Sequence, residues 1–144
     1  MIEQDTIRLL RECDAGVKMG VTSIDDVIDY VGNSEFREIL KSCRKKHEEI
    51  DSELQTLLDK YHDEGKEPAI MAKSMSWLKT NIMLAVNESD HTVADLITDG
   101  CNMGVKSLGK YLNKYKAADE KSKDITKRLM NVEEKLAADI RVYL

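Results

Sequence analysis

The sequence has few aromatic residues and no long apolar segment. Aromatic residues make up 5% of the 144 positions, and Phe36 is the one phenylalanine. Because aromatic side chains are enriched in strands, their scarcity argues against a β-rich fold. No apolar run approaches the roughly 20 residues that cross a bilayer. The polar, acidic start of the chain lacks the features of a secretory signal, so we expect a cytoplasmic protein that does not enter a membrane.

Cysteine is also sparse. The chain has three cysteines, Cys13, Cys43 and Cys101, which lie far apart in the sequence. An odd number of widely spaced cysteines does not form a disulfide framework. Their usage therefore suits a reducing compartment such as the cytoplasm.

Charged residues are plentiful, at 34%, beside 42% hydrophobic residues. This balance is typical of an ordinary water-soluble protein, and the length suits a single domain that spans residues 1–144. The net charge is −5, yet residues 101–144 carry 10 Lys and Arg against 6 Asp and Glu. The basic residues of this segment are interrupted by acidic ones, and the net charge of the whole chain is negative. A solvated helix face explains the stripe better than nucleic-acid binding does.

Apolar residues recur every three or four positions along almost the whole chain, which is the spacing of helices that bury one face. The stripe passes through Leu10, Cys13 and Val17 near the N-terminus and through Ile125 and Leu129 near the C-terminus. The pattern predicts five helices, over residues 3–31, 35–62, 69–87, 90–116 and 122–143.

The connections between these helices predict two antiparallel hairpins. Gly32-Asn33-Ser34 ends the first helix, because glycine suits a left-handed exit and Asn33 or Ser34 can cap the next helix. Such a short turn makes the two helices antiparallel. Pro68, the one proline, fits the first turn of the helix at 69–87, which spans roughly 28 Å at 1.5 Å per residue. That helix is long enough to cross over along the bundle.

A weak internal repeat agrees with this layout. Met19-Gly20-Val21-Thr22-Ser23-Ile24 resembles Met103-Gly104-Val105-Lys106-Ser107-Leu108, and each stretch lies on the first helix of its hairpin. Both helices carry glycines at matching positions, which would let a neighbour approach closely. The matched glycines are Gly16 and Gly20 with Gly100 and Gly104. The match favours duplication of a helical hairpin.

Two hairpins joined by a long crossover resemble the layout of the ferritin-like superfamily. Four stretches spread over most of the chain also resemble a bacterial ferritin-like domain family of unknown function. They are Leu10-Arg11-Glu12-Cys13-Asp14-Ala15-Gly16-Val17, His47-Glu48-Glu49-Ile50-Asp51-Ser52-Glu53-Leu54, Trp77-Leu78-Lys79 with Ser89-Asp90, and Asp99-Gly100-Cys101 running to Lys110-Tyr111. The resemblance implies an all-α, ferritin-like four-helix bundle of two antiparallel hairpins with an additional crossover helix.

A ferritin-like fold raises the question of a di-iron centre, which takes carboxylates from two helices and a Glu-x-x-His motif from each of the other two. His47 is the one histidine on an apolar stripe, but Arg44 stands three residues before it, and a guanidinium repels a cation. On the last helix, Glu133 and Glu134 lack a histidine three positions later. Neither motif is complete, so we expect no cofactor and favour a non-catalytic protein.

Two reduced metal sites are alternatives. His47, Asp99 and Glu133 are the best remaining donors for an iron or zinc ion. Cys43 and His47 are four residues apart, which suits zinc on one helical face, although a structural zinc needs two more ligands. The simpler interpretation is that the cysteines are small buried apolar residues and that His47 is a core histidine with a satisfied hydrogen bond.

The sequence thus predicts a bundle that acts by binding or self-assembly. We expect a homodimer or another homo-oligomer, because most soluble oligomers pair identical chains symmetrically. The alternative is a metal-binding protein that uses His47, Asp99 and Glu133 for iron handling or for protection against oxidative stress. Neither nucleic acid nor a membrane is an expected partner.

Overall fold

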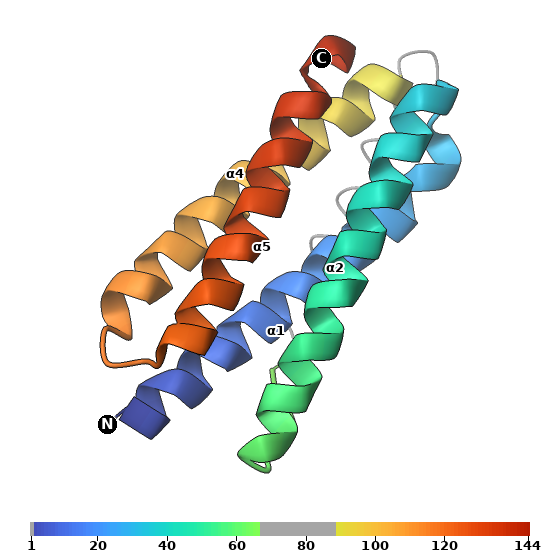
Figure 1. Cartoon of the computed structure of the whole chain (residues 1–144). Coiled ribbons are helices and arrows are strands. Elements are labelled where there is room, and N and C mark those ends of the chain that lie inside the picture. Colours follow the sequence, from blue (N-terminus) through green and yellow to red (C-terminus); the bar gives the residue numbers. More distant parts are fainter. Residues whose placement is uncertain (1, 67–88) are drawn as a thin grey trace.

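The computed structural model describes residues 2–66 and 89–144. These residues form an all-helical bundle that contains no strand (Figure 1), which confirms the all-α part of the expected fold. The predicted helix at 69–87 lies outside the described residues. The long helices are α1 (Ile2–Val27), α2 (Ser34–Lys60), α4 (Ser89–Lys114) and α5 (Glu120–Asp139), and short 3-10 turns cover Ile28–Tyr30 and Arg141–Tyr143.

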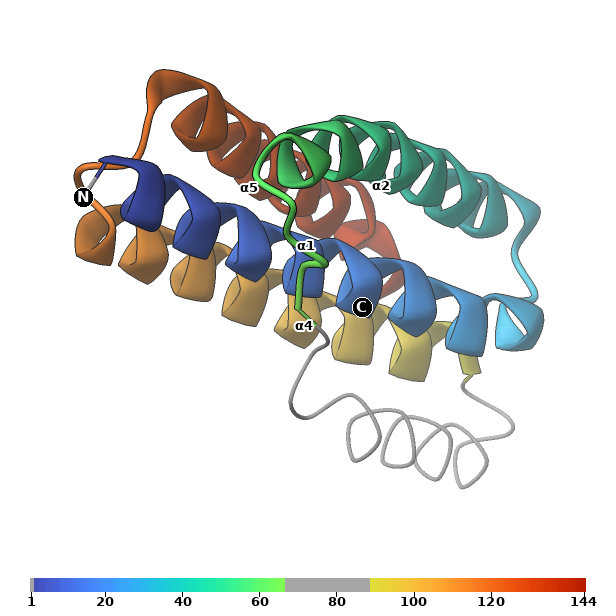
Figure 2. The same ribbon diagram turned by 90° about the horizontal axis from the view of Figure 1, so that it is seen from below.

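The four helices pack in two layers, with α1 beside α4 and α2 beside α5 (Figure 2). Helices α1 and α5 each contact all three other long helices, so they also meet across the bundle. At that crossing the Cys13 sulfur of α1 lies 3.1 Å from the Thr126 hydroxyl of α5. Gly16 of α1 faces Leu129 of α5 at an ordinary packing distance.

The core follows the apolar stripes of the sequence. One cluster of buried side chains surrounds Phe36 and Leu40, near the connection between α1 and α2. A second cluster, around Leu10, Leu54 and Leu129, fills the bundle toward its other end. None of the helices in the described part of the chain combines the length and apolar character that are needed to cross a bilayer.

The connection between α1 and α2 differs in detail from its prediction. Helix α1 ends at Val27 instead of 31, and a 3-10 turn follows it. The prediction of a left-handed Gly32 is wrong, since its φ is not positive. Instead, the backbone amides of Gly32 and Asn33 donate to the carboxylate of Asp90 on α4, at 2.7 and 3.0 Å. The Asn33 side chain caps α2 as predicted, by accepting from the Phe36 amide.

The C-terminal helix is also shorter than predicted. Helix α5 starts at Glu120, where Asp119 caps it by accepting from the Ser122 amide at 2.8 Å. It ends at Asp139 instead of 143, and the 3-10 turn that follows stacks the ring of Tyr143 on that of Phe36 at 4.5 Å. This stacking closes the apolar cluster at that end of the bundle.

A buried carboxylate fastens the chain that leaves α2 to the side of α1. Asp14 is fully buried and accepts hydrogen bonds from the Gln55 side chain at 3.0 Å and from the Lys66 amide at 2.9 Å. The Lys18 ammonium lies 2.9 Å from it. Gly65 has φ +85°, and a Cβ there would collide with the Asp14 carboxylate. The turn around Gly65 therefore fits over Asp14 only with glycine at this position.

Candidate functional site

His47 lies on α2 and is buried inside the bundle. Its Nδ1 is 2.9 Å from the carbonyl oxygen of Cys43, one turn earlier. Because a carbonyl only accepts, Nδ1 carries the proton and Nε2 keeps a lone pair. Nε2 has no hydrogen-bond partner among the described residues, and burial lowers the pKa of the imidazole. The predicted core histidine is therefore neutral, with one nitrogen satisfied and the other not.

Glu133 is a buried acid on α5. Its Oε2 atom finds no hydrogen-bond partner in residues 2–66 and 89–144. Burial away from water raises the pKa of this carboxyl to about 8. At neutral pH Glu133 is therefore mostly a protonated, uncharged acid, which is much less costly to bury than a carboxylate.

Each of these two side chains packs onto a glycine of a neighbouring helix. A Cβ on Gly20 of α1 would stand 2.5 Å from Nε2 of His47, and a Cβ on Gly104 of α4 would collide with the carboxyl group of Glu133. Gly20 and Gly104 are matched positions of the sequence repeat, so both halves of the chain use the same arrangement. The expected close approach is confirmed at these two glycines. At Gly100 it is wrong, because no atom lies within 4 Å of an added Cβ.

The three residues that the sequence suggested as metal ligands are not gathered at one point. His47 and Glu133 are buried, whereas Asp99 is exposed on α4. Within the described ranges, no group of three or more His, Cys, Asp or Glu side chains is arranged to hold a metal ion. Arg44, one turn before His47, pairs at the surface with Asp25 of α1 at 2.5 Å.

Cys43 and His47 lie close together on α2, but within the described residues no third ligand is grouped with them. The Cys43 sulfur lies 3.6 Å from Nδ1 of His47, but this nitrogen already bonds to the Cys43 carbonyl. Burial raises the pKa of the Cys43, Cys13 and Cys101 thiols to about 12, so these side chains are uncharged at neutral pH. All three cysteines are buried and free, which agrees with their interpretation as small apolar residues.

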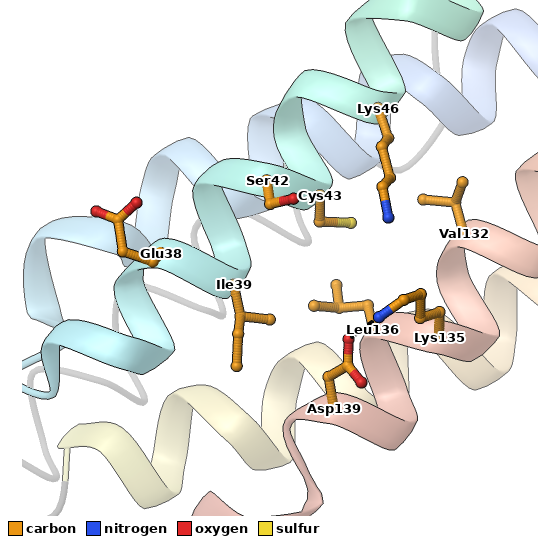
Figure 3. A pocket seen from close by; sticks show the side chains of 9 residues that line it. All are labelled: Glu38, Ile39, Ser42, Cys43, Lys46, Val132, Lys135, Leu136 and Asp139. Carbon is orange, nitrogen blue, oxygen red and sulfur yellow. Dashed lines mark hydrogen bonds and ion pairs between the residues drawn. The ribbon is translucent and has the colours of Figure 1, made fainter.

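The structure also contains a groove that the sequence does not predict. It lies between α2 and α5 and has a volume of about 300 Å³. Its floor is apolar, and charged side chains stand along its rim (Figure 3). The floor is made by Ile39, Cys43, Val132 and Leu136. The sequence hardly distinguishes these floor residues, because they also belong to the apolar stripes that build the core.

The rim of this α2–α5 groove carries one uncompensated positive charge. Lys135 pairs with Asp139 at 2.6 Å, and Glu38 pairs with Lys41 at 3.5 Å. Lys46 has no ion-pair partner among the residues that the structure describes. Figure 3 shows its ammonium pointing into the gap between the two helices. The groove therefore combines an apolar surface with a single available cation.

Comparison with known proteins adds no relative: the chain matches no family model, no curated protein and no solved structure. Two features of the described residues bear on function. The interior holds two neutral, partly unsatisfied side chains, His47 and Glu133, packed on glycines. The α2–α5 groove is open to solvent and combines an apolar floor with charged side chains along its rim (Figure 3).

Proposed function

We propose that this chain is a ferritin-like bundle of two antiparallel hairpins, with residues 69–87 as its crossover, that acts by binding and not by catalysis. Contacts between α1 and α2 support the first hairpin. Arg11 pairs with Asp63, just beyond α2, and Asp25 pairs with Arg44. The residue numbers rise on one helix as they fall on the other, as they do in an antiparallel pair.

Contacts between α4 and α5 support the second hairpin in the same way. Gly104 lies against Glu133, and Gly109, five residues later, lies against Met130, three residues earlier. The three buried, free cysteines support the cytoplasm as the compartment, because a reducing environment keeps thiols in that form.

The placement of His47 and Glu133 against glycines is the observation that carries the non-catalytic role. A di-iron centre needs further carboxylates from the facing helices to complete the coordination of its metals. Here the facing positions are Gly20 and Gly104, and the side-chain tips fill the space where a ligand would begin. We therefore favour a bundle without a resident cofactor. The alternative is iron or zinc bound at His47, Asp99 and Glu133, with a role in iron handling or oxidative-stress protection.

Metal analysis of the purified protein tests this proposal. We expect iron and zinc far below one ion per chain, both as isolated and after incubation with either metal followed by desalting. A stoichiometric ion that is lost in His47→Ala would establish the alternative. The matched control is His91→Ala, because His91 is an exposed histidine on α4 and should leave any metal content unchanged.

Self-association is the second part of the proposal. Val142 and Leu144 are 80% and 50% exposed, and Tyr143 between them stacks on Phe36 at the start of α2. The chain end therefore lies beside the connection between α1 and α2 (Figure 1), where Tyr30 is also exposed. Large apolar side chains gathered at one exposed end favour pairing with an identical surface.

Light scattering coupled to size-exclusion chromatography tests self-association. We expect a mass of twice 16.4 kDa that shifts toward the monomer in Val142→Lys. Met103→Lys is the control, because Met103 is an exposed apolar residue on α4 and does not belong to the end that carries Val142 and Leu144. A 16.4 kDa species at every protein concentration would contradict the proposal.

A further inference from the structure

The α2–α5 groove has the size of a site for a small ligand. On α2 it extends from Glu38 to Lys46, which is about 12 Å at 1.5 Å per residue, and on α5 it extends from Val132 to Asp139. Its volume of about 300 Å³ lies at the lower end of the range for small-molecule pockets, roughly 300–1,000 Å³.

Among the described residues, the ion pair that bridges α2 and α5 lies beyond the groove. Toward the C-terminal end of α2 and the N-terminal end of α5, Arg128 makes a bidentate pair with Glu53, at 2.7 and 2.9 Å. Over the groove itself, no ion pair joins the two helices within the described ranges. The small side chain of Ser42 forms part of the α2 wall and leaves the floor accessible.

The charges around the groove favour an anion. The Lys135 and Asp139 charges offset each other, and Glu38 is offset by Lys41. The Lys46 charge remains without a partner among the described residues. Its position above the gap (Figure 3) lets the ammonium contact the negative group of a ligand whose apolar part lies on the floor. A long lysine side chain can turn to such a partner at little cost, since it has no competing carboxylate.

We propose that the α2–α5 groove binds an amphipathic monocarboxylate, with its carboxylate on the Lys46 ammonium and its hydrocarbon part on Ile39, Val132 and Leu136. This inference deepens the proposed binding function and rests on it. The apolar floor excludes a small hydrophilic anion as the best ligand, because that ligand would leave the floor in water. The single cation matches one carboxylate.

A small molecule fits the groove better than a protein segment does. A helix with its side chains is about 10–12 Å across and buries its apolar face along several turns, whereas the groove is about as long as such a helix is wide. The charged rim also closes both sides of a short floor. A second copy of the chain would need a longer unbroken apolar surface.

Titration with octanoate, followed by methyl NMR, tests this assignment. We expect octanoate to shift the methyl signals of Ile39, Val132 and Leu136 in a saturable way. Octylammonium, which has the same hydrocarbon chain and the opposite charge, should bind more weakly. Acetate, which has the charge without the chain, should leave these signals unchanged.

Paired variants separate the groove from the rest of the surface. Lys46→Met should weaken octanoate binding about fivefold, as expected for loss of one exposed ion pair. Lys45→Met, an exposed neighbour outside the groove, should not change it. Ser42→Trp should block binding by filling the groove from an exposed position, whereas Ser52→Trp, exposed farther along α2, should bind as the wild type does.

Three results would overturn the assignment. The first is no saturable shift, the second is equal binding of octanoate and octylammonium, and the third is a loss of affinity that is the same in Lys45→Met and Lys46→Met. Groove signals that shift with protein concentration alone would show that a second copy covers the groove. Metal analysis remains independent of all these outcomes, so a failure here is distinguishable from a failure of the cofactor-free bundle.

Discussion

The imidazole of His47 occupies the space beside Gly20 that a Cβ would otherwise fill. The second half of the chain repeats this relationship, with the carboxyl of Glu133 against Gly104. In both cases a polar side chain from one helix lies against a bare stretch of backbone on its neighbour. These contacts set how closely α1 can approach α2 and how closely α4 can approach α5.

Alanine at either glycine should therefore destabilise the fold. In Gly20→Ala the new methyl group would overlap the His47 ring, and in Gly104→Ala it would overlap the Glu133 carboxyl. Overpacking of this kind costs about 1–3 kcal/mol, and the higher helix propensity of alanine returns up to about 1 kcal/mol. We expect the free energy of unfolding to fall by about 1–2 kcal/mol in each variant, measured by urea denaturation.

Gly100→Ala is the matched control for this prediction. Gly100 is also on α4, but an added Cβ there meets no atom within 4 Å. Only the helix propensity changes, so the free energy of unfolding should rise by about 0.5–1 kcal/mol. If Gly104→Ala also stabilised the protein, the contact with Glu133 would not constrain the helix spacing.

The sequence predicts the helices well because the apolar spacing directly records which face each helix buries. It predicts the helix ends less well. Gly32 looked like a left-handed exit, but its amide is used by Asp90, 58 residues away. Nothing in the local sequence signals a partner so distant. The shortened end of α5 has a similar cause, since Tyr143 leaves the helix path to stack on Phe36.

The candidate site was predictable in part. His47 stands on an apolar stripe, so the sequence identifies it as a buried polar residue. Glu133 is recognisable in the sequence only as an acid on the last helix, and its burial is seen in the structure. The partner of each is a glycine, and the repeat marks both Gly20 and Gly104 without showing what fills the space beside them. Asp99 was misleading, because helix spacing alone does not show that its side chain faces water. The α2–α5 groove arises from the distance between two helices, and no single-helix pattern encodes that distance.

Stability should depend on pH through Glu133. Burial raises the pKa of its carboxyl from 4.5 to about 8 in the folded state. A raised folded-state pKa means that the folded protein holds this proton more tightly than the unfolded chain does. Its stabilising contribution is full below about pH 4.5, declines as the pH rises, and is gone above about pH 8. Within this window the loss approaches about 1.4 kcal/mol per pH unit.

Glu133→Gln should remove this dependence, because glutamine has the same shape and does not ionise. We expect the wild type to lose stability relative to Glu133→Gln as the pH rises from 5 to 8. Urea denaturation at each pH measures the free energy of unfolding of both proteins. Glu134→Gln is the control, since Glu134 is the exposed neighbour on the same helix. Parallel pH profiles for Glu133→Gln and the wild type would show that Glu133 is not held in its protonated form.

The Asp14 carboxylate should be needed to hold the turn at Gly65 against α1. In Asp14→Ala the Gln55 side chain and the Lys66 amide both lose their acceptor. Removal of a buried, hydrogen-bonded charge should lower the free energy of unfolding by about 2–4 kcal/mol. Native-state hydrogen exchange should show a local effect as well, with much faster exchange of the Lys66 amide. Asp51→Ala is the control, because Asp51 also accepts from Gln55 but does not contact the turn.

Gly65→Ala provides an independent test of the same contact. The φ of +85° is unfavourable for alanine, and its Cβ would also collide with Asp14. We expect the Lys66 amide to lose protection in this variant, with a smaller loss of global stability than in Asp14→Ala, because the buried carboxylate can keep its bond to Gln55. Unchanged protection of the Lys66 amide in both variants would mean that the turn is held by something other than Asp14. The ion pair of Lys66 with Glu12, at 2.6 Å, would then be the contact to remove next.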